Sequence, residues 1–305
     1  MTEPFVIDTQ MHGRAQITAA YVLRGERTAL IETGPKSSLE HVLAGLSAAG
    51  VEELDWIVVT HIHLDHAGAA GSIASLFPQA QVAVHEVGAP HLIDPSRLWS
   101  SAARIYGDEM DRLWGGIDPI PPDRVHALSD GDKIDLGGRV LEAIDTPGHA
   151  YHHHVFLDDA TGIAFTGDAL GVRLPDVGVI RPATPPPEFN LEIAIASIER
   201  IASVGAEALW PTHFGSAHEG VDAADVATTC EMAVDALNMW AGWVKAGRSR
   251  SDDLDDIAAE VTAQARAHYE GRIADDATDR LEQTTSYRMN TWGYLRYFEK
   301  AKRAT

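Results

Sequence analysis

Four potential metal ligands lie within six consecutive residues of this chain, at positions 61–66. The four are His61, His63, Asp65 and His66. Imidazole nitrogens together with carboxylate oxygens suit zinc, iron or manganese. The group directly follows the hydrophobic residues 56–59, and packing does not explain so many polar side chains after a buried strand. The spacing therefore predicts a metal site at the end of this strand.

Three further potential ligands stand at the ends of later hydrophobic segments. They are His149 in a Thr-Pro-Gly-His sequence, Asp168 in Thr-Gly-Asp, and His213 in Pro-Thr-His. Each short sequence taken alone is typical of a turn. Loops at one edge of a sandwich of sheets converge, so residues that are far apart in the chain can meet there. We therefore expect these three side chains to join the first four.

The elements that must position these ligands alternate between strands and helices over the first two-thirds of the chain. Apolar and alternating runs predict strands at residues 17–23, 29–32, 54–59, 81–85, 125–128, 139–145, 155–157, 163–165 and 208–210. Helical periodicity predicts helices at residues 38–49, 67–77, 97–114 and 191–204. This alternation predicts an α/β chain in which the ligands follow strand ends.

The character of the sequence changes near residue 221. Residues 221–245, 251–269 and 286–302 show helical periodicity without strand signals. The sequence therefore predicts a main domain over residues 1–220 and a helical C-terminal extension over residues 221–305 that packs on it. Residues 86–124 are rich in proline and are predicted to be an insertion near the site. Their His91, Trp99, Tyr106 and Trp114 are expected to be core residues, with the lining of an apolar cleft as the alternative.

The ordered set of motifs resembles the metallo-β-lactamase superfamily, whose signature is a His-x-His-x-Asp-His run followed by single His, Asp and His ligands. The resemblance covers about residues 15–215, and residues 60–71 and 146–149 are especially similar to the glyoxalase II and lactonase branches. It implies a fold of the α/β (α+β) class, a four-layer αββα sandwich with the metals at one edge of the two sheets. The helical C-terminal extension would be added to this sandwich.

The resemblance also implies a ligand set for two divalent ions, expected to be Zn²⁺, with iron or manganese as alternatives. The first ion would be held by His61, His63 and His149, the second by Asp65, His66 and His213, and Asp168 would bridge both. Asp145 matches no ligand position. His153 is expected to orient a ligand, whereas His152 and His154 have no assigned role. The chain departs from the pattern at Glu32, where relatives commonly carry aspartate before Thr-Gly, and this affects the hydrogen bonding behind the ligands.

A two-metal site generates hydroxide from water, which predicts hydrolysis of an ester, lactone or thioester of a small acid. Asp65 is the candidate for orienting the nucleophile and passing a proton to the leaving group. Tyr151 is the candidate donor to a substrate carbonyl. Two alternatives stay open: hydrolysis of a small phosphodiester on the same metals, and iron-dependent oxidation of the persulfide dioxygenase kind. The filled ligand set favours hydrolysis over redox chemistry and over a non-catalytic scaffold.

Composition limits the partners. The chain has 24 Lys and Arg residues against 45 Asp and Glu, a net charge of −21, which disfavours binding to long nucleic acids. No signal-peptide pattern and no membrane-spanning apolar stretch is visible, and the single cysteine, Cys230, forms no intrachain disulfide. We therefore expect a cytoplasmic enzyme with a small-molecule substrate and no membrane association. The aromatic C-terminal helices are expected to pack on the main domain, with a homodimer face as the alternative.

Overall fold

The computed structural model describes residues 3–220, 222–269 and 273–304, and the chain divides into two units. Unit 1 comprises Met1–Asp145 and His152–Gly167, and unit 2 comprises Thr146–Tyr151 and Asp168–Thr305. The predicted boundary between residues 220 and 221 falls beside residue 221, which lies outside the described residues.

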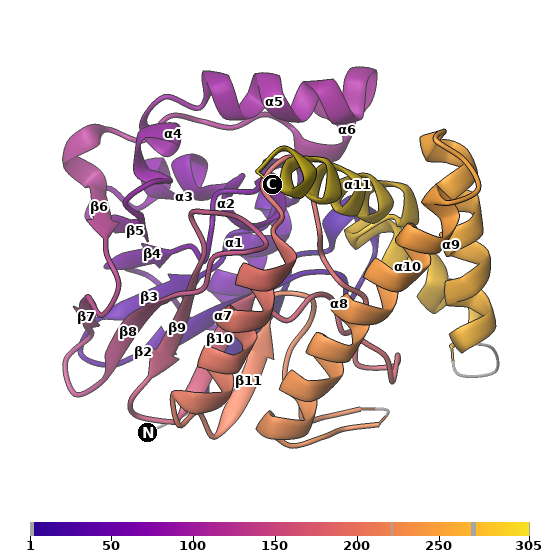
Figure 1. Ribbon diagram of the computed structural model, residues 1–305. Coiled ribbons are helices and arrows are strands. Elements are labelled where there is room, and N and C mark those ends of the chain that lie inside the picture. Colours follow the sequence, from indigo (N-terminus) through magenta and orange to yellow (C-terminus); the bar gives the residue numbers. More distant parts are fainter. Residues whose placement is uncertain (1–2, 221, 270–272, 305) are drawn as a thin grey trace. The chain divides into compact units, whose positions relative to one another are not determined.

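The first sheet of unit 1 contains six strands that follow one another in sequence order (Figure 1). They are β1 (Phe5–Asp8), β2 (Ala19–Arg24), β3 (Thr28–Ile31), β4 (Trp56–Val58), β5 (Gln81–His85) and β6 (Val125–Leu128). The pairs β1·β2 and β2·β3 are antiparallel, whereas β3 to β6 pair in parallel. Because parallel strands end at the same edge of a sheet, the chain leaves β3, β4 and β5 at one common edge. The histidine cluster follows β4 at that edge.

The second sheet contributes four antiparallel strands to unit 1. They are β7 (Lys133–Asp135), β8 (Val140–Asp145), β9 (His154–Asp158) and β10 (Ile163–Gly167). Tyr21 of β2 and Phe165 of β10 are buried, and their ring centroids lie 5.2 Å apart, so the two sheets share a packed interior. Arg139 and Asp158 form a fully buried ion pair next to β8, with two hydrogen bonds of 3.0 Å.

Six α-helices belong to unit 1. They are α1 (Leu39–Ala48), α2 (Leu64–Ala67), α3 (Ala70–Leu76), α4 (Ala89–Ile93), α5 (Ser96–Tyr106) and α6 (Met110–Trp114), with 3₁₀ turns η1 (Met11–Gly13), η2 (Lys36–Ser38), η3 (Gly107–Glu109) and η4 (Pro122–Arg124). Val42 and Leu46 of α1 and Ile73 of α3 pack against Ile57 of β4 and Val82 of β5. Hydrophobic burial against these helices therefore fixes the strands that lead to the histidine cluster.

Unit 2 is mostly helical (Figure 1). Its elements are α7 (Leu191–Ser203), β11 (Ala208–Pro211), α8 (Val226–Arg248), α9 (Leu254–Tyr269), α10 (Asp275–Thr284) and α11 (Tyr287–Ala304). Asn190 and Asp225 cap α7 and α8, because their side chains accept hydrogen bonds from Ile193 and Thr228 backbone N–H groups. The rings of Trp240 in α8 and Tyr287 in α11 stack 5.6 Å apart. Aromatic side chains of the C-terminal helices thus pack among themselves within unit 2.

Several predicted elements differ from the structure for identifiable reasons. The helix predicted at residues 67–77 is confirmed as α3 over Ala70–Leu76, but it begins later than predicted, after the Ala69 N–H has donated to Gly34 O. The helix predicted at residues 97–114 is interrupted at Gly107, whose φ is +54°. The sequence analysis missed β1, β7, α4 and α10, which are short or polar. The strands at residues 81–85 and 125–128 are confirmed.

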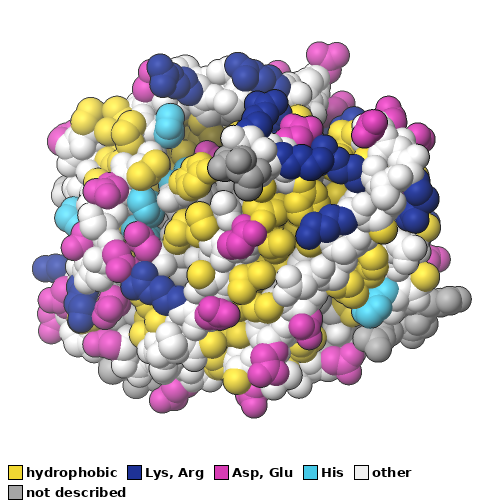
Figure 2. Space-filling view, viewed as in Figure 1, with side chains coloured by type: hydrophobic (Ala, Val, Ile, Leu, Met, Phe, Trp, Pro, Cys, Tyr) yellow, Lys and Arg dark blue, Asp and Glu magenta, His cyan; other side chains and the backbone are white. Residues whose placement is uncertain are grey.

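No helix in the described ranges combines the length and apolarity needed to cross a membrane. Acidic side chains are spread over the face drawn in Figure 2 and are not gathered in one patch. Cys230 is buried in α8, and burial raises the pKa of its thiol to about 11. Its thiolate is therefore scarce at neutral pH.

Candidate metal centre

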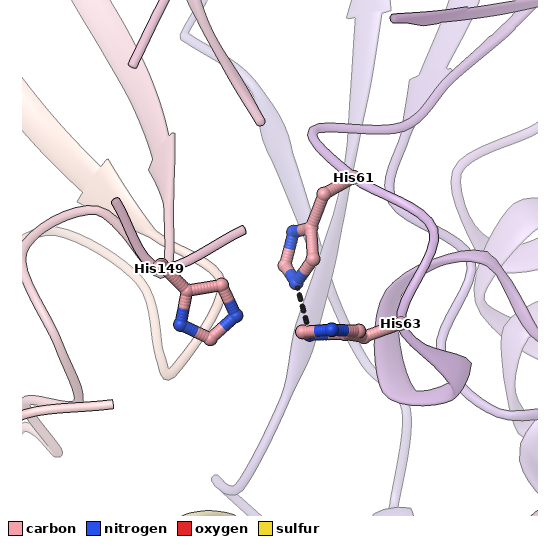
Figure 3. A group of neighbouring side chains, drawn as sticks. All are labelled: His61, His63 and His149. Atoms are coloured by element: carbon pink, nitrogen blue, oxygen red, sulfur yellow. Dashed lines mark hydrogen bonds between the residues drawn. The ribbon is translucent and has the colours of Figure 1, made fainter. Parts of the chain in front are cut away.

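The chain leaving β4 brings His61 and His63 together in unit 1. His61 Nε2 and His63 Nδ1 lie 3.0 Å apart, as the dashed line in Figure 3 marks. Two nitrogens that bind one zinc ion at tetrahedral angles are separated by roughly 3.4 Å. Figure 3 also labels His149, which belongs to unit 2. The spacing of His61 and His63 therefore fits two ligands of one ion.

The short helix α2 carries the next two predicted ligands. His66 is fully buried, and its Nε2 lies 3.6 Å from Asp65 Oδ2. Asp65 keeps 14% of its side chain exposed. Buried imidazole beside a partly exposed carboxylate is a donor set suited to a divalent transition-metal ion. Unit 1 therefore brings all four ligands of the first predicted cluster to one strand end.

Glu32, which stands where relatives commonly carry aspartate, contacts the residues of this cluster. Its side chain is buried, its Oε2 lies 3.2 Å from His66 Nδ1, and its Oε1 accepts a 3.1 Å hydrogen bond from the Thr60 N–H. Thr60 Oγ1 is also 3.0 Å from His61 Nδ1. Each contact engages Nδ1 and leaves the Nε2 atom of the histidine for a metal ion. Glu32 thus contacts the Nδ1 side of His66 despite having a longer side chain than aspartate. Its backbone is left-handed, with φ +64°.

Replacing Glu32 by glutamine is expected to weaken metal binding by about 10- to 100-fold, which is the usual effect of losing a group that orients a histidine ligand. If the glutamine oxygen keeps the bond from the Thr60 N–H, its NH₂ donor faces the His66 Nδ1–H, and that proton loses its acceptor. Metal affinity would be measured by competition with a chromophoric chelator. Glu52→Gln changes an exposed glutamate and serves as the control. An unchanged affinity in Glu32→Gln would show that Glu32 does not orient His66.

Two of the three consecutive histidines after Tyr151 also lie beside the cluster in unit 1. The fully buried His153 has its ring centroid 4.9 Å from that of His61, and the His152 ring stacks on His61 at 6.1 Å. At Gly167, with φ +51°, an added Cβ would stand 2.6 Å from both His153 Nε2 and Thr60 Oγ1. The close approach therefore requires glycine immediately before Asp168. The expected orienting role of His153 remains a prediction.

Unit 2 brings together the other three predicted ligands. His149 Nε2 lies 3.5 Å from Asp168 Oδ2, and His213 Nε2 lies 3.5 Å from Asp168 Oδ1. All three side chains are buried. The two oxygens of one carboxylate thus face two different histidines, which is the arrangement expected of a carboxylate that joins two ions.

The C-terminal helix α11 fixes the orientation of His149 through the backbone of residues 182–184. His149 Nδ1 lies 2.9 Å from Ala183 O, so Nε2 is left for a metal ion. On either side of Ala183, the buried Asn290 donates from Nδ2 to Pro182 O at 2.6 Å and accepts at Oδ1 from the Thr184 N–H at 3.0 Å. The sequence analysis did not single out Asn290, because a lone asparagine in a helix carries no pattern.

Asn290→Ala is expected to lower the affinity of the protein for metal by about 10-fold or more, because the Ala183 carbonyl that orients His149 loses both supports. Asn290→Asp keeps the Oδ1 acceptor for Thr184 and should lose less. Chelator competition measures the affinity, and denaturant unfolding of metal-free protein separates this effect from a general loss of stability. Asn238→Ala, on the exposed side of α8, is the matched control. Equal affinities in Asn290→Ala and the control would contradict the positioning role.

The candidate substrate residues have different surroundings in the two units. Tyr151 of unit 2 is 47% exposed. A small cavity in the same unit lies beside His149 and Asp168, with apolar walls that include Leu170, Phe189 and Leu237. The hollow has room for about one water-sized molecule beside the two predicted ligands.

In unit 1 the aromatic side chains of the proline-rich insertion belong to a core cluster. Trp114 packs with Leu64, and Trp99 and Tyr106 pack against this cluster, so the expectation of core residues is confirmed for them. His12, which the sequence analysis missed, contacts Trp114 edge to face at 5.6 Å. Burial lowers the pKa of His12, although the charge of Asp65 opposes the shift. The His12 imidazole, whose pKa is lowered, is therefore close enough to Asp65 to interact with its charge.

Comparison with known proteins places these motifs in a family. The model of the metallo-β-lactamase superfamily matches residues 13–213. The metallo-β-lactamase fold-containing protein ST1585 of Sulfurisphaera tokodaii is 31% identical over 212 residues, which cover 68% of this chain and 74% of that protein. The crystal structure of ST1585 from Sulfolobus tokodaii aligns with a TM-score of 0.66 at 24% identity, over 92% of this chain and 93% of that chain. These findings confirm the predicted fold class.

Two further relatives carry names that describe a reaction. A hydroxyacylglutathione hydrolase of Aeromonas hydrophila is 31% identical over 131 residues, covering 43% of this chain and 39% of that protein. The atrochrysone carboxyl ACP thioesterase of Aspergillus fumigatus is 26% identical over 200 residues, covering 65% of this chain and 51% of that protein. Each of these two matches covers only part of the relative's own length.

Proposed function

Because this chain belongs to the metallo-β-lactamase superfamily, we propose that it is a hydrolase that holds two divalent metal ions and cleaves a thioester of a small acid. The observation that carries the proposal is Asp168, whose two carboxylate oxygens face two different histidines at 3.5 Å. One ion would be held by His61, His63 and His149, the other by Asp65, His66 and His213, with Asp168 joining them. Zn²⁺ is the ion we propose, since imidazole and carboxylate ligands suit it.

When bound, the two ions would supply hydroxide at neutral pH and polarise the attacked carbonyl oxygen. The residues of the chain perform the remaining tasks. Asp65 orients the attacking water and passes its proton to the leaving sulfur, so that thioester and water give an acid and a thiol. Tyr151 donates a hydrogen bond to the substrate carbonyl from its exposed position. Glu32 and Ala183 O hold His66 and His149 in the orientation that directs Nε2 to the ions.

The choice of a thioester over an ester or lactone rests on two of the relatives. The names of the two hydrolytic relatives state hydrolysis of hydroxyacylglutathione, which is a thioester, and thioesterase activity. The small cavity beside His149 and Asp168 has room for about one water-sized molecule, so it does not distinguish among acyl groups, and the choice rests on the names of these relatives. The net charge of −21 argues against a polynucleotide substrate, so the substrate is a small molecule.

The proposal is tested with the protein in defined zinc, manganese and iron forms on a panel of acyl-glutathione and acyl-pantetheine thioesters, lactones, a small phosphodiester and a β-lactam. We expect the zinc form to cleave a thioester with kcat/KM on the order of 10⁴ M⁻¹s⁻¹ or higher. Failure of every substrate in all metal forms would refute hydrolysis. One iron per chain together with oxygen consumption on a persulfide would favour the oxidoreductase alternative instead.

A further inference from the structure

A second group of potential metal ligands lies in unit 1 and involves none of the seven residues assigned above. His85 is the last residue of β5 in the first sheet, and Asp145 is the last residue of β8 in the second. His154 begins β9, directly opposite Asp145 in the antiparallel register. Strand pairing and sheet packing thus place two imidazoles and one carboxylate at one point, although they are far apart in the chain.

The ligand atoms of this group are close enough to share an ion. His154 Nε2 is 2.7 Å and His85 Nε2 is 3.5 Å from the same atom, Asp145 Oδ1. The two imidazole rings stack with their centroids 4.4 Å apart, and one ligand atom from each of the three residues falls within 4.8 Å of the others. These separations bracket the roughly 3.4 Å expected between ligands of a tetrahedral zinc ion.

We propose that His85, Asp145 and His154 form a further metal site, which binds one Zn²⁺ or a similar divalent transition-metal ion and joins the two sheets of unit 1. Two imidazole nitrogens exclude Ca²⁺ and Mg²⁺, which prefer oxygen ligands. Asp145 keeps 37% of its side chain exposed, so an ion can enter from solvent and water can complete the coordination.

The surroundings of the group favour a cation. His154 is fully buried, and its Nε2 is directed at Asp145 Oδ1. Without an ion, both histidines direct Nε2 toward a single carboxylate oxygen. The Asp130 carboxylate lies beside the group and accepts a 2.9 Å hydrogen bond from the Asp145 N–H. One divalent ion would replace the imidazole protons and balance two neighbouring carboxylates.

Binding through His85 Nε2 requires one local change. His85 Nδ1 now accepts a 3.0 Å hydrogen bond from the Val87 N–H, so in the neutral ring the proton sits on Nε2. For Nε2 to bind an ion, that proton must move to Nδ1 and the bond from Val87 must open. Val87 is 50% exposed, so its N–H can turn to water at little cost.

The test counts metal ions in the whole protein. Wild-type protein would be dialysed to equilibrium against micromolar free Zn²⁺, and zinc per chain would be measured by plasma mass spectrometry. We expect one ion more per chain in the wild type than in Asp145→Asn and in His85→Gln. The Asn side chain keeps the size and the hydrogen-bond acceptor of Asp145, and two separate variants guard against misfolding of either one. Because the result is a difference in count, it does not depend on how many ions the first centre holds.

His126→Gln is the matched control, since His126 is an exposed histidine on the neighbouring strand β6. It should bind as many ions as the wild type. Equal counts in the wild type and both site variants would overturn the proposal and leave a hydrogen-bonded His–Asp–His group. A loss of the same size in His126→Gln would assign the extra ion to the surface and would overturn it as well. Circular dichroism of each variant confirms that the compared proteins are folded.

Discussion

Asp168→Ala is expected to release bound metal and to lower kcat/KM for hydrolysis by at least about 10³-fold. The physical reason lies in the two carboxylate oxygens, each 3.5 Å from a different histidine of unit 2. Removing this carboxylate takes away a negative group that both His149 and His213 face. Asp168→Asn keeps the shape and loses the charge, and we expect it to retain the fold with much weaker metal binding.

Metal per chain by mass spectrometry and initial hydrolysis rates measure this effect, and His61→Ala should give the same result from unit 1. Asp235→Ala, an exposed aspartate on α8, is the control and should keep both metal and activity. Full activity in Asp168→Ala or His61→Ala protein that carries no metal would refute the metal-dependent mechanism.

The second large effect concerns stability and the buried ion pair between Arg139 and Asp158. Both side chains are fully buried and joined by two 3.0 Å hydrogen bonds, from Nε to Oδ1 and from one terminal NH₂ group to Oδ2. Arg139→Ala leaves a buried carboxylate without its charged partner, and we expect the free energy of unfolding to fall by about 3–5 kcal/mol. Replacing both residues by apolar side chains of similar size should restore much of that loss.

Urea denaturation of the metal-loaded protein measures this change. Lys133→Ala is the control, because its pair with Glu142 is largely exposed and its removal should cost less than about 1 kcal/mol. If Arg139→Ala and Lys133→Ala lose the same free energy, the buried pair does not stabilise unit 1 as argued.

The candidate ligands stand out in the sequence because they lie in the segments that follow strand ends. The cluster after β4 is local, so its chemistry is visible within six residues. The groups behind it are not local. Glu32 reaches His66 only because β3 and β4 pair in parallel, and Asn290 reaches Pro182 O and the Thr184 N–H across more than a hundred residues of chain. A pattern in one segment cannot reveal such partners.

The same difference between local patterns and distant contacts explains why the group of His85, Asp145 and His154 was not predicted from the sequence. Neither histidine belongs to a motif, and Asp145 matched no ligand position in the family pattern. Their proximity depends on the register of β8 with β9 and on the packing of two sheets, which short sequence windows do not encode. The predicted start of one helix differs for a related reason. The Ala69 N–H donates to the distant Gly34 carbonyl, so α3 begins only at Ala70.

The hydrogen bonds of Asn290 also bear on how short an active protein can be. The family match ends at residue 213, whereas the side chain that brackets Ala183 lies 77 residues further on, in α11. A chain trimmed to the matched region would retain all seven predicted ligands and still lack the clamp on the carbonyl that orients His149. We therefore expect a chain trimmed at residue 213 to bind metal more weakly than the full chain, because it lacks the hydrogen bonds of Asn290 to residues 182 and 184.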